Sequence, residues 1–104
     1  MQTIIIVLDP KKMENPDLDI RYILPERIEE ITKGLVKDNG YDYLPDNSMG
    51  IWLDTDDAEK NVKAVVELLG SEKILDNNLS NSAEIYISET DCAELDKCCR
   101  VSPD

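Results

Sequence analysis

The sequence predicts an α+β fold: one ferredoxin-like domain whose split β-α-β arrangement forms a two-layer sandwich with a C-terminal extension. A chain of 104 residues is long enough for one domain with a modest core. Two segments repeat their apolar residues at helical spacing, while others alternate or stay apolar throughout. The resulting order is β-α-β-β-α-β, which right-handed crossovers arrange as such a sandwich. We expect one domain over residues 1–104, with a core over about residues 3–88 and a tail over residues 89–104.

The first and third strands of this order are expected to be central in the sheet. "TIIIVL", residues 3–8, is continuously apolar and β-branched, which is typical of a strand buried on both faces. "MGIWLD" alternates instead, so Met49, Ile51 and Leu53 share one face of the third strand. Trp52 takes the other face. With "YDYL" before it and "PDNS" between, this segment predicts a hairpin.

The first helix is expected over residues 25–36. Proline suits the first helical position, and acidic residues in the next turns complement the positive end of a helix. The glutamates in question are Glu26, Glu29 and Glu30. "DNG", which ends at Gly40, should stop the helix. The alternating residues 17–23 before it are interpreted as a short edge strand or an ordered extended segment.

A second amphipathic helix is expected from Ala58 to a stop at Gly70, with Thr55 or Asp54 as its cap. Its apolar positions are Ala58, Val62, Val65, Val66 and Leu69. The following residues 71–82 read mostly as loop, and "AEIYIS", residues 83–88, reads as a strand with Tyr86 opposite its two isoleucines. The tail fits either a short helix or a strand.

Charge narrows the class of partner. The chain has 11 Lys and Arg against 23 Asp and Glu, a net charge of −12. Nucleic acid and anionic membrane would repel such a protein, so neither is expected as a partner. A basic protein, metal cations or simple solubility all fit the charge. No segment resembles a signal peptide or approaches the ~18 apolar residues of a membrane span, so we expect a cytoplasmic protein.

Composition also argues against an enzyme and against a bound cofactor. The chain has no histidine, the commonest general base and a common zinc ligand. Three cysteines, Cys92, Cys98 and Cys99, lack the spacing of a disulfide framework and read as reduced cytosolic thiols. A structural zinc site would need a fourth ligand. We therefore expect no metal and no catalytic residues.

Four carboxylates stand together where the third strand gives way to the second helix: Asp54, Asp56, Asp57 and Glu59. An EF-hand loop begun at Asp54 fails, because Glu59 falls where glycine is required and Val65 falls where glutamate is required. A looser Mg²⁺ site on Asp54 and Asp56, or a catalytic pair of Asp54 and Asp57, is a weaker alternative. Capping and the helix dipole explain this cluster best when it is taken alone.

A wider acidic window, residues 38–59, suggests a binding surface. It holds seven carboxylates, no Lys or Arg, and three of the chain's five aromatic residues. One-signed charge steers a basic partner, and aromatic residues anchor it. The competing interpretation is that Trp52 packs under residues 9–23 and the tyrosines cover sheet edges. The residues predicted to bind the partner are Asp38, Tyr41, Asp42, Tyr43, Asp46, Trp52, Asp54, Asp56, Asp57 and Glu59.

Four phrases, "LDPKK", "NPDLDIRYILPERIEE", "DNGYDY" and "GIWLDTDD", lie within residues 8–57, a span of about half the chain. In them the sequence resembles small acidic immunity proteins of bacterial contact-dependent growth inhibition and related polymorphic toxin systems. The resemblance implies a cytosolic antitoxin that binds the cognate toxin C-terminal domain, commonly a basic nuclease, at its active site or an exosite. It transfers no residue roles, so the predicted site depends on charge and aromatic content. The alternative is a small acidic regulatory or adaptor module, which self-association through the sheet would also suit.

Overall fold

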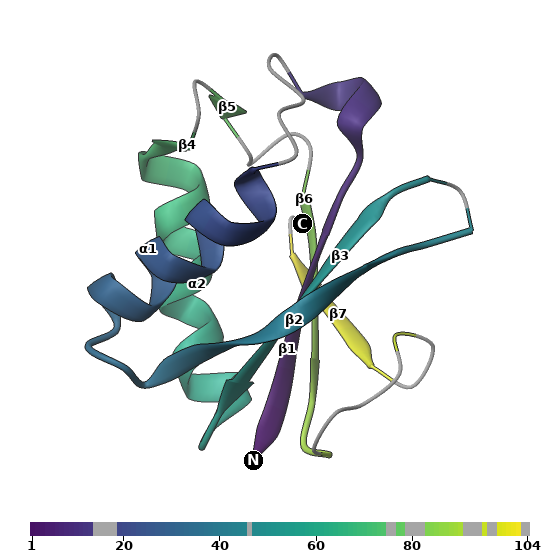
Figure 1. The fold of residues 1–104 in the computed structure, drawn as a ribbon. Coiled ribbons are helices and arrows are strands. Elements are labelled where there is room, and N and C mark those ends of the chain that lie inside the picture. Colours follow the sequence, from purple (N-terminus) through teal and green to yellow (C-terminus); the bar gives the residue numbers. More distant parts are fainter. Residues whose placement is uncertain are drawn as a thin grey trace.

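A five-stranded antiparallel sheet forms the centre of the protein and carries two helices on one face (Figure 1). This computed structural model describes residues 1–13, 19–45, 47–74, 77–78, 83–90, 95 and 98–102. Read across the sheet, the strands are β2 (Val36–Tyr43), β3 (Met49–Thr55), β1 (Gln2–Leu8), β6 (Ala83–Ser88) and β7 (Cys99–Ser102). The helices are α1 (Ile20–Ile31) and α2 (Ala58–Ser71). The predicted α+β class is confirmed, and so are the inner positions of the first and third predicted strands.

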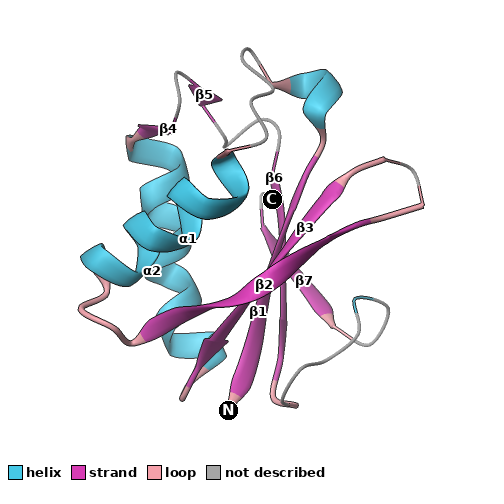
Figure 2. Cartoon of the chain, in the orientation of Figure 1, coloured by secondary structure: helices cyan, strands magenta, loops and turns pink. Residues whose placement is uncertain are grey.

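The remaining elements are short. A 3₁₀ turn, η1 (Pro10–Lys12), follows β1, and the strand pair β4 (Lys73–Ile74) and β5 (Asn77–Asn78) follows α2 (Figure 2). The tail, which the sequence left open between helix and strand, contributes β7 as an edge strand beside β6.

The core lies between the sheet and the two helices. β1 directs Ile4, Ile6 and Leu8 into it, while Ile5 and Val7 point to the other face and are also buried. This burial on both sides explains the unbroken apolar run of β1. α2 adds Val62, Val65 and Leu69, and β3 adds Met49, Ile51 and Leu53, as their spacing predicted. α2 also buries Leu68, which the predicted spacing did not include, while Val66 is only partly buried.

α1 begins before Pro25, which the sequence had placed at the first helical position. The buried side chains of α1 are Ile20, Leu24, Pro25 and Ile28. The four-residue spacing of Ile20, Leu24 and Ile28 gives the helix a core face that extends upstream of the proline. Ile23 N–H already donates to the Asp19 carbonyl at 3.1 Å, so the first turn is closed there. The expectation of a strand or extended segment is therefore wrong from residue 20 onward, and residues 17–18 lie outside the described part of the chain.

α1 also ends earlier than predicted, because its last turn closes on a glycine that the sequence analysis did not use. Lys33 and Gly34 adopt positive φ angles of 55° and 83°. Gly34 N–H donates to the Glu29 carbonyl at 2.9 Å, which satisfies one of the helix's last carbonyl groups. Val36 is consequently the first residue of β2 and not the last residue of a helix.

Gly40, the predicted helix stop, instead lies in β2. Its φ is 95°, and the pairing of β2 with β3 shifts register between Asp38 and Tyr41. The Asp38 carboxylate accepts the Gly40 N–H at 2.9 Å. The glycine thus permits a β-bulge, where one strand needs a conformation that side chains disfavour.

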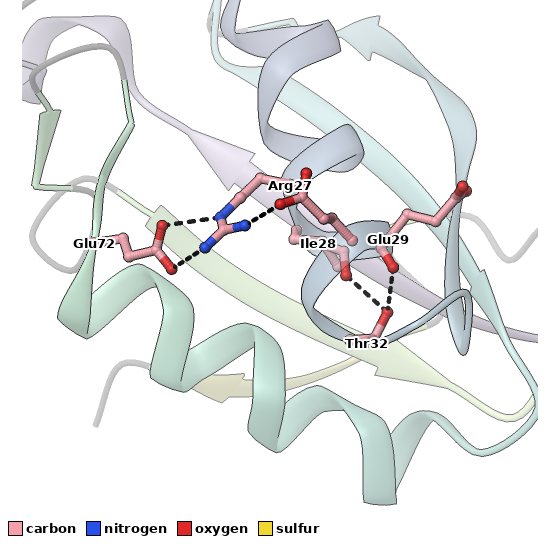
Figure 3. A network of polar contacts seen from close by, with 6 residues as sticks. Arg27, Ile28, Glu29, Thr32 and Glu72 are labelled. Carbon is pink, nitrogen blue, oxygen red and sulfur yellow. Dashed lines mark hydrogen bonds and ion pairs between the residues drawn. The ribbon is translucent and has the colours of Figure 1, made fainter.

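Thr32 joins the end of α1 to the start of β2. Its hydroxyl donates to the Ile28 carbonyl at 2.7 Å (Figure 3) and accepts the Val36 N–H at 3.2 Å. The side chain is 7% exposed, so both hydrogen bonds are made inside the protein. One buried hydroxyl therefore satisfies groups on two elements at once.

Asp57 caps α2, where the sequence had favoured Thr55 or Asp54. The Asp57 carboxylate accepts the backbone N–H three residues on at 3.1 Å. The Thr55 hydroxyl, buried beneath the helix start, accepts a hydrogen bond from the Asn61 side chain at 2.6 Å. The helix also passes through Gly70, the predicted stop, and ends one residue later.

Arg27 ties the two helices together (Figure 3). Its guanidinium donates to both carboxylate oxygens of Glu72, just after α2, each at 3.0 Å, and also contacts Glu30. This two-point geometry matches the planar fork of arginine to a carboxylate. Glu72 hydrogen bonding raises the pKa of Arg27, and the same hydrogen bond lowers the pKa of Glu72.

Candidate partner-binding surface

The described residues predicted to bind a partner lie in four places. The open face is the sheet face away from α1 and α2. Trp52 and Asp54 lie on it because they alternate along β3 with core residues, and Asp42 lies on it because it pairs with Gly50, which is on the same face as Trp52. Tyr41 and Tyr43 point to the opposite face of β2. Asp56, Asp57 and Glu59 lie at the start of α2, Asp38 lies at the β-bulge, and Asp46 falls outside the described residues.

Trp52 lies in a transverse row on the open face. Ile5 of β1 pairs with Trp52 on one side and with Tyr86 of β6 on the other. Ile5 is fully buried, while both aromatic side chains are partly exposed. Trp52 is therefore on the sheet face away from α1. The alternative that it packs beneath residues 9–23 is wrong for residues 20–23, which belong to α1, and residues 14–18 lie outside the described part of the chain. The two rings flank an aliphatic centre that they help to remove from water.

Carboxylates border this aromatic row. Asp54, next to Trp52, accepts a hydrogen bond from the Asn39 amide at 3.0 Å. On the far side, Glu84 accepts the Tyr86 hydroxyl at 2.8 Å and lies 3.7 Å from the Arg100 guanidinium. The Glu84 hydrogen bond raises the pKa of Tyr86. An apolar centre with a polar rim is the usual anatomy of a protein–protein interface.

The tyrosine cluster, Tyr22, Tyr41 and Tyr43, lies on the helix side of β2. Tyr22 comes from α1 and makes an edge-to-face contact with Tyr41, with ring centroids 6.0 Å apart. Tyr41 makes a second such contact with Tyr43 at 6.1 Å. The three side chains are 52%, 40% and 51% exposed. Exposed aromatic residues gathered from two elements mark a surface suited to binding.

Arg21 stacks on this cluster. Its guanidinium carbon lies 4.5 Å from the Tyr22 ring centroid and 5.0 Å from that of Tyr41. Hydrogen bonding to Tyr22 raises the pKa of Arg21, and the hydrogen bond from Arg21 is the largest cause of the lowered pKa of Tyr22. Sequence reasoning missed Arg21 and Tyr22 because it treated residues 17–23 as extended. Ile20, Leu24 and Ile28 are four residues apart, and this spacing was the sequence signal that Arg21 and Tyr22 belong to a helix.

The start of α2 forms a separate acidic end of the molecule. A cavity of about 370 Å³ lies there between α2, β1 and β6, and its lining includes Gln2, Asp57, Glu59, Glu89 and Cys99. Gln2 accepts the Ala58 N–H at 2.7 Å, so this corner is tied to the first strand. Asp57 is engaged as the helix cap, while Asp56 and Glu59 are exposed.

The acidic window keeps its charge at the surface. The ion pairs between described residues use Glu30, Glu72 and Glu84, all outside the window. Within the described part of the window, four carboxylates, those of Asp38, Asp42, Asp54 and Asp57, accept hydrogen bonds from backbone N–H groups or from an asparagine, and no described carboxylate of the window pairs with Lys or Arg. These hydrogen bonds hold the carboxylates in place without neutralising them.

Metal-binding clusters, membrane-spanning helices and cysteines can be described for the same residues of the chain. Among them, no group of three or more Cys, Asp or Glu side chains is arranged to hold a metal ion. No described helix combines the length and apolarity needed to cross a membrane. Cys98 and Cys99 are thiols, half-buried and exposed respectively, and Cys92 lies outside the described residues.

Comparisons with protein-family models, with curated proteins and with solved structures found no match for this chain.

Proposed function

We propose that this protein is an immunity protein that binds and neutralises the toxin domain of a contact-dependent growth inhibition system. The expected toxin is a basic protein, with a nuclease as the expected class. The sequence phrases that resemble acidic immunity proteins support the proposal, and so does the net charge of −12. In this proposal the protein acts by binding and carries out no reaction.

One observation carries the proposal: unneutralised carboxylates of the acidic window share the surface with aromatic residues that are exposed or partly exposed. Asp54 shares the open face with the partly exposed Trp52, and the Asp42 carboxylate accepts the backbone N–H of the exposed Tyr43 at the outer edge of β2. Neither carboxylate is paired with a described cation. A nuclease must present cations to nucleic-acid phosphates, so a field of carboxylates competes for the same toxin surface.

The two kinds of residue have different roles in the proposed complex. Exposed charges are screened beyond a Debye length of about 8 Å at physiological salt, so they mainly set the rate of association and its salt dependence. Aromatic anchors in the centre of an interface govern dissociation. Substitutions of the exposed charged residues should therefore mainly change the association rate, and substitutions of the aromatic anchors should mainly change the dissociation rate.

The fold can be named more finely within the same proposal. We infer a ferredoxin-like topology, in which β1, α1, β2, β3, α2 and β6 supply the two β-α-β halves. The strand order β2-β3-β1-β6 supports this assignment, and β7 would then be an addition to the sheet's edge. The β4–β5 pair would not belong to the ferredoxin-like topology.

The test uses the product of the adjacent upstream reading frame as toxin. One variant combines Asp42→Lys, Asp56→Lys and Glu59→Lys, three exposed carboxylates of the window. A matched control combines Glu26→Lys, Glu29→Lys and Glu67→Lys, which change the net charge equally from exposed helical positions. The window variant should slow association and lose protection of toxin-expressing cells, while the control protects.

Two results would contradict this assignment. If the neighbouring product is neither toxic nor bound, the immunity function is wrong and the adaptor alternative gains. If the helical control loses protection while the window variant protects fully, the interface lies on α1 or α2. Circular dichroism spectra and thermal melts of both variants confirm that each is folded before binding is compared.

A further inference from the structure

We propose that the tyrosine cluster of Tyr22, Tyr41 and Tyr43 is the site that receives an arginine side chain from a basic protein partner. The proposal deepens the proposed function, since it rests on the partner being basic. It assigns a recognition mode to residues of β2 and α1, and α1 lies outside the acidic window.

Exposure is the first argument. About half of the Tyr22 and Tyr43 side chains and 40% of Tyr41 remain accessible to water. Three aromatic side chains therefore stay on the surface of a chain that has only five. Edge-to-face contacts hold the rings at interplanar angles of 88° and 84°, so they are fixed relative to one another. A pre-fixed aromatic surface loses little entropy when a partner binds.

Arg21 gives the second argument, because it shows which chemistry these rings accept. A guanidinium at 4.5 Å and 5.0 Å from two ring centroids lies within the range where the negative face of an aromatic ring attracts a cation. Within the tyrosine cluster, Tyr41 contacts both Tyr22 and Tyr43. A second guanidinium stacked at Tyr43 would extend the same arrangement outward.

Charge complementarity is the third argument. The Asp42 side chain leaves β2 on the open face, and its carboxylate accepts the Tyr43 N–H at 2.9 Å at the outer edge of the strand. No Lys or Arg occurs between residues 38 and 59. A cation that approaches the Tyr43 ring from the outer edge of β2 therefore also comes near a carboxylate that no described Lys or Arg pairs with. Arginine suits both, since its planar head stacks on rings and binds carboxylates.

Addition of a partner strand to β2 is the competing mode for an edge strand. Leu44 N–H donates to the Ser48 carbonyl, and Asp42 pairs in register with Gly50. The alternation of an antiparallel ladder then turns the Tyr43 N–H outward, where the Asp42 carboxylate already holds it. A new strand would have to displace this carboxylate, so contact through side chains is favoured.

The test is an NMR titration of the 104-residue protein with a hexa-arginine peptide at 150 mM salt, which screens the general negative field. The largest amide shifts should fall on β2 and on the first turn of α1. Tyr43→Leu, which keeps an apolar side chain but removes the ring, should weaken binding roughly two- to five-fold. Tyr43→Phe should bind as the wild type does, since the ring face is kept.

Leu35→Ala is the matched control, because Leu35 is an exposed apolar residue, 54% accessible, outside the tyrosine cluster. It should leave affinity unchanged. Tyr22→Leu repeats the test from α1 if Tyr43→Leu does not fold. Equal losses in Tyr43→Phe and Tyr43→Leu, shifts centred on the start of α2, or a loss as large in Leu35→Ala would each overturn the proposal.

Failure of the immunity function is distinguishable from failure of this site. A neighbouring product that is not a toxin removes the proposed function but leaves the peptide titration unaffected. A protective protein whose tyrosine variants bind the peptide normally removes only the cation site. The two experiments share no readout.

Discussion

The indole of Trp52 occupies the space that a side chain at Gly50 would need. A Cβ atom built at Gly50 would lie 2.5 Å from Cζ3 of the Trp52 ring, well inside van der Waals contact. The two residues are on the same face of β3, two positions apart. The glycine thus lets the ring lie along the strand, over the open face of the sheet.

Gly50→Ala should therefore destabilise the protein, because either the indole or the strand must move. We expect a loss of about 1–3 kcal/mol in the free energy of unfolding, as for other overpacked sites. Trp52 is the only tryptophan, so its fluorescence should shift in the folded variant as well. Urea unfolding followed by fluorescence measures both effects.

Gly70→Ala is the control for that experiment. Gly70 lies in the last turn of α2, and a Cβ there would meet no atom within 4 Å. The substitution should stabilise the protein by up to about 1 kcal/mol, since alanine favours helix. If Gly50→Ala proves as harmless as Gly70→Ala, the ring does not occupy the position described.

Thr32→Val should be destabilising although it keeps the shape of the side chain. The valine can neither donate to the Ile28 carbonyl nor accept the Val36 N–H, so that buried donor is left without the threonine hydroxyl. An unsatisfied buried polar group costs about 1–3 kcal/mol. Thermal or urea unfolding should show this loss, and Thr32→Ser, which keeps the hydroxyl, should recover most of it.

Asp57→Ala should cost about 1 kcal/mol of unfolding free energy, within a usual range of roughly 0.5–2, because α2 loses its capping carboxylate. Asp56→Ala is the comparison, since it removes the same charge one residue earlier. We expect that variant to stay within about 0.5 kcal/mol of the wild type. Equal effects in urea unfolding would assign the loss to charge and not to the cap.

The Arg27–Glu72 pair should make stability depend on pH in acid. Because Arg27 lowers the pKa of Glu72 below its ordinary 4.5, the carboxylate stabilises the folded state above that pH. The contribution is lost as the pH falls through the lowered folded-state pKa. The wild type should thus exceed Glu72→Gln in stability near neutral pH, and the difference should shrink below pH 4.5.

Arg27→Ala provides the control for this pH effect. In that background the bidentate partner is gone, so Glu72→Gln should produce little pH-dependent difference. Both side chains are more than a third exposed, so the effect is expected to be small and to weaken with salt. Urea unfolding at several pH values between 3 and 7 measures it. A difference that persists unchanged in the Arg27→Ala background would assign it to another group.

Trp52→Ala should speed dissociation of the proposed toxin complex. If Trp52 is an anchor, the loss is about 2 kcal/mol or more, mostly in the dissociation rate. Surface plasmon resonance with the immobilised toxin domain separates the two rate constants. An unchanged dissociation rate in a folded variant would exclude the open face around Trp52 from the interface.

Much of the fold followed from local sequence pattern. The apolar run of β1, the alternation in β3 and β6, and the helical spacing in α2 each specify an element whose burial can be read from a few neighbouring residues. The hairpin between β2 and β3 followed in the same way. These predictions succeeded because periodicity reports directly which side of an element meets the core.

The start of α1 depended on more distant contacts, whereas its end followed from a local glycine, Gly34, that the sequence analysis did not use. Pro25 marks a helix start by local preference, yet burial of Ile20 and Leu24 against the sheet extends the helix upstream of it. The positive φ angles of Lys33 and Gly34, and not those near Gly40, end it. Packing thus overrode the local proline signal.

The arrangement of the acidic window as a whole was decided by tertiary structure. The sequence determined that residues 38–59 are acidic and aromatic and that Trp52 lies on the other face of its strand from Met49, Ile51 and Leu53, but not which other residues of the window share either face. Strand alternation sends Tyr41 and Tyr43 to one side of the sheet and Trp52 to the other, while the docking of α1 brings Tyr22 to the first two. Residues close in sequence were separated and residues far apart were joined, because each side chain follows the face of its own element.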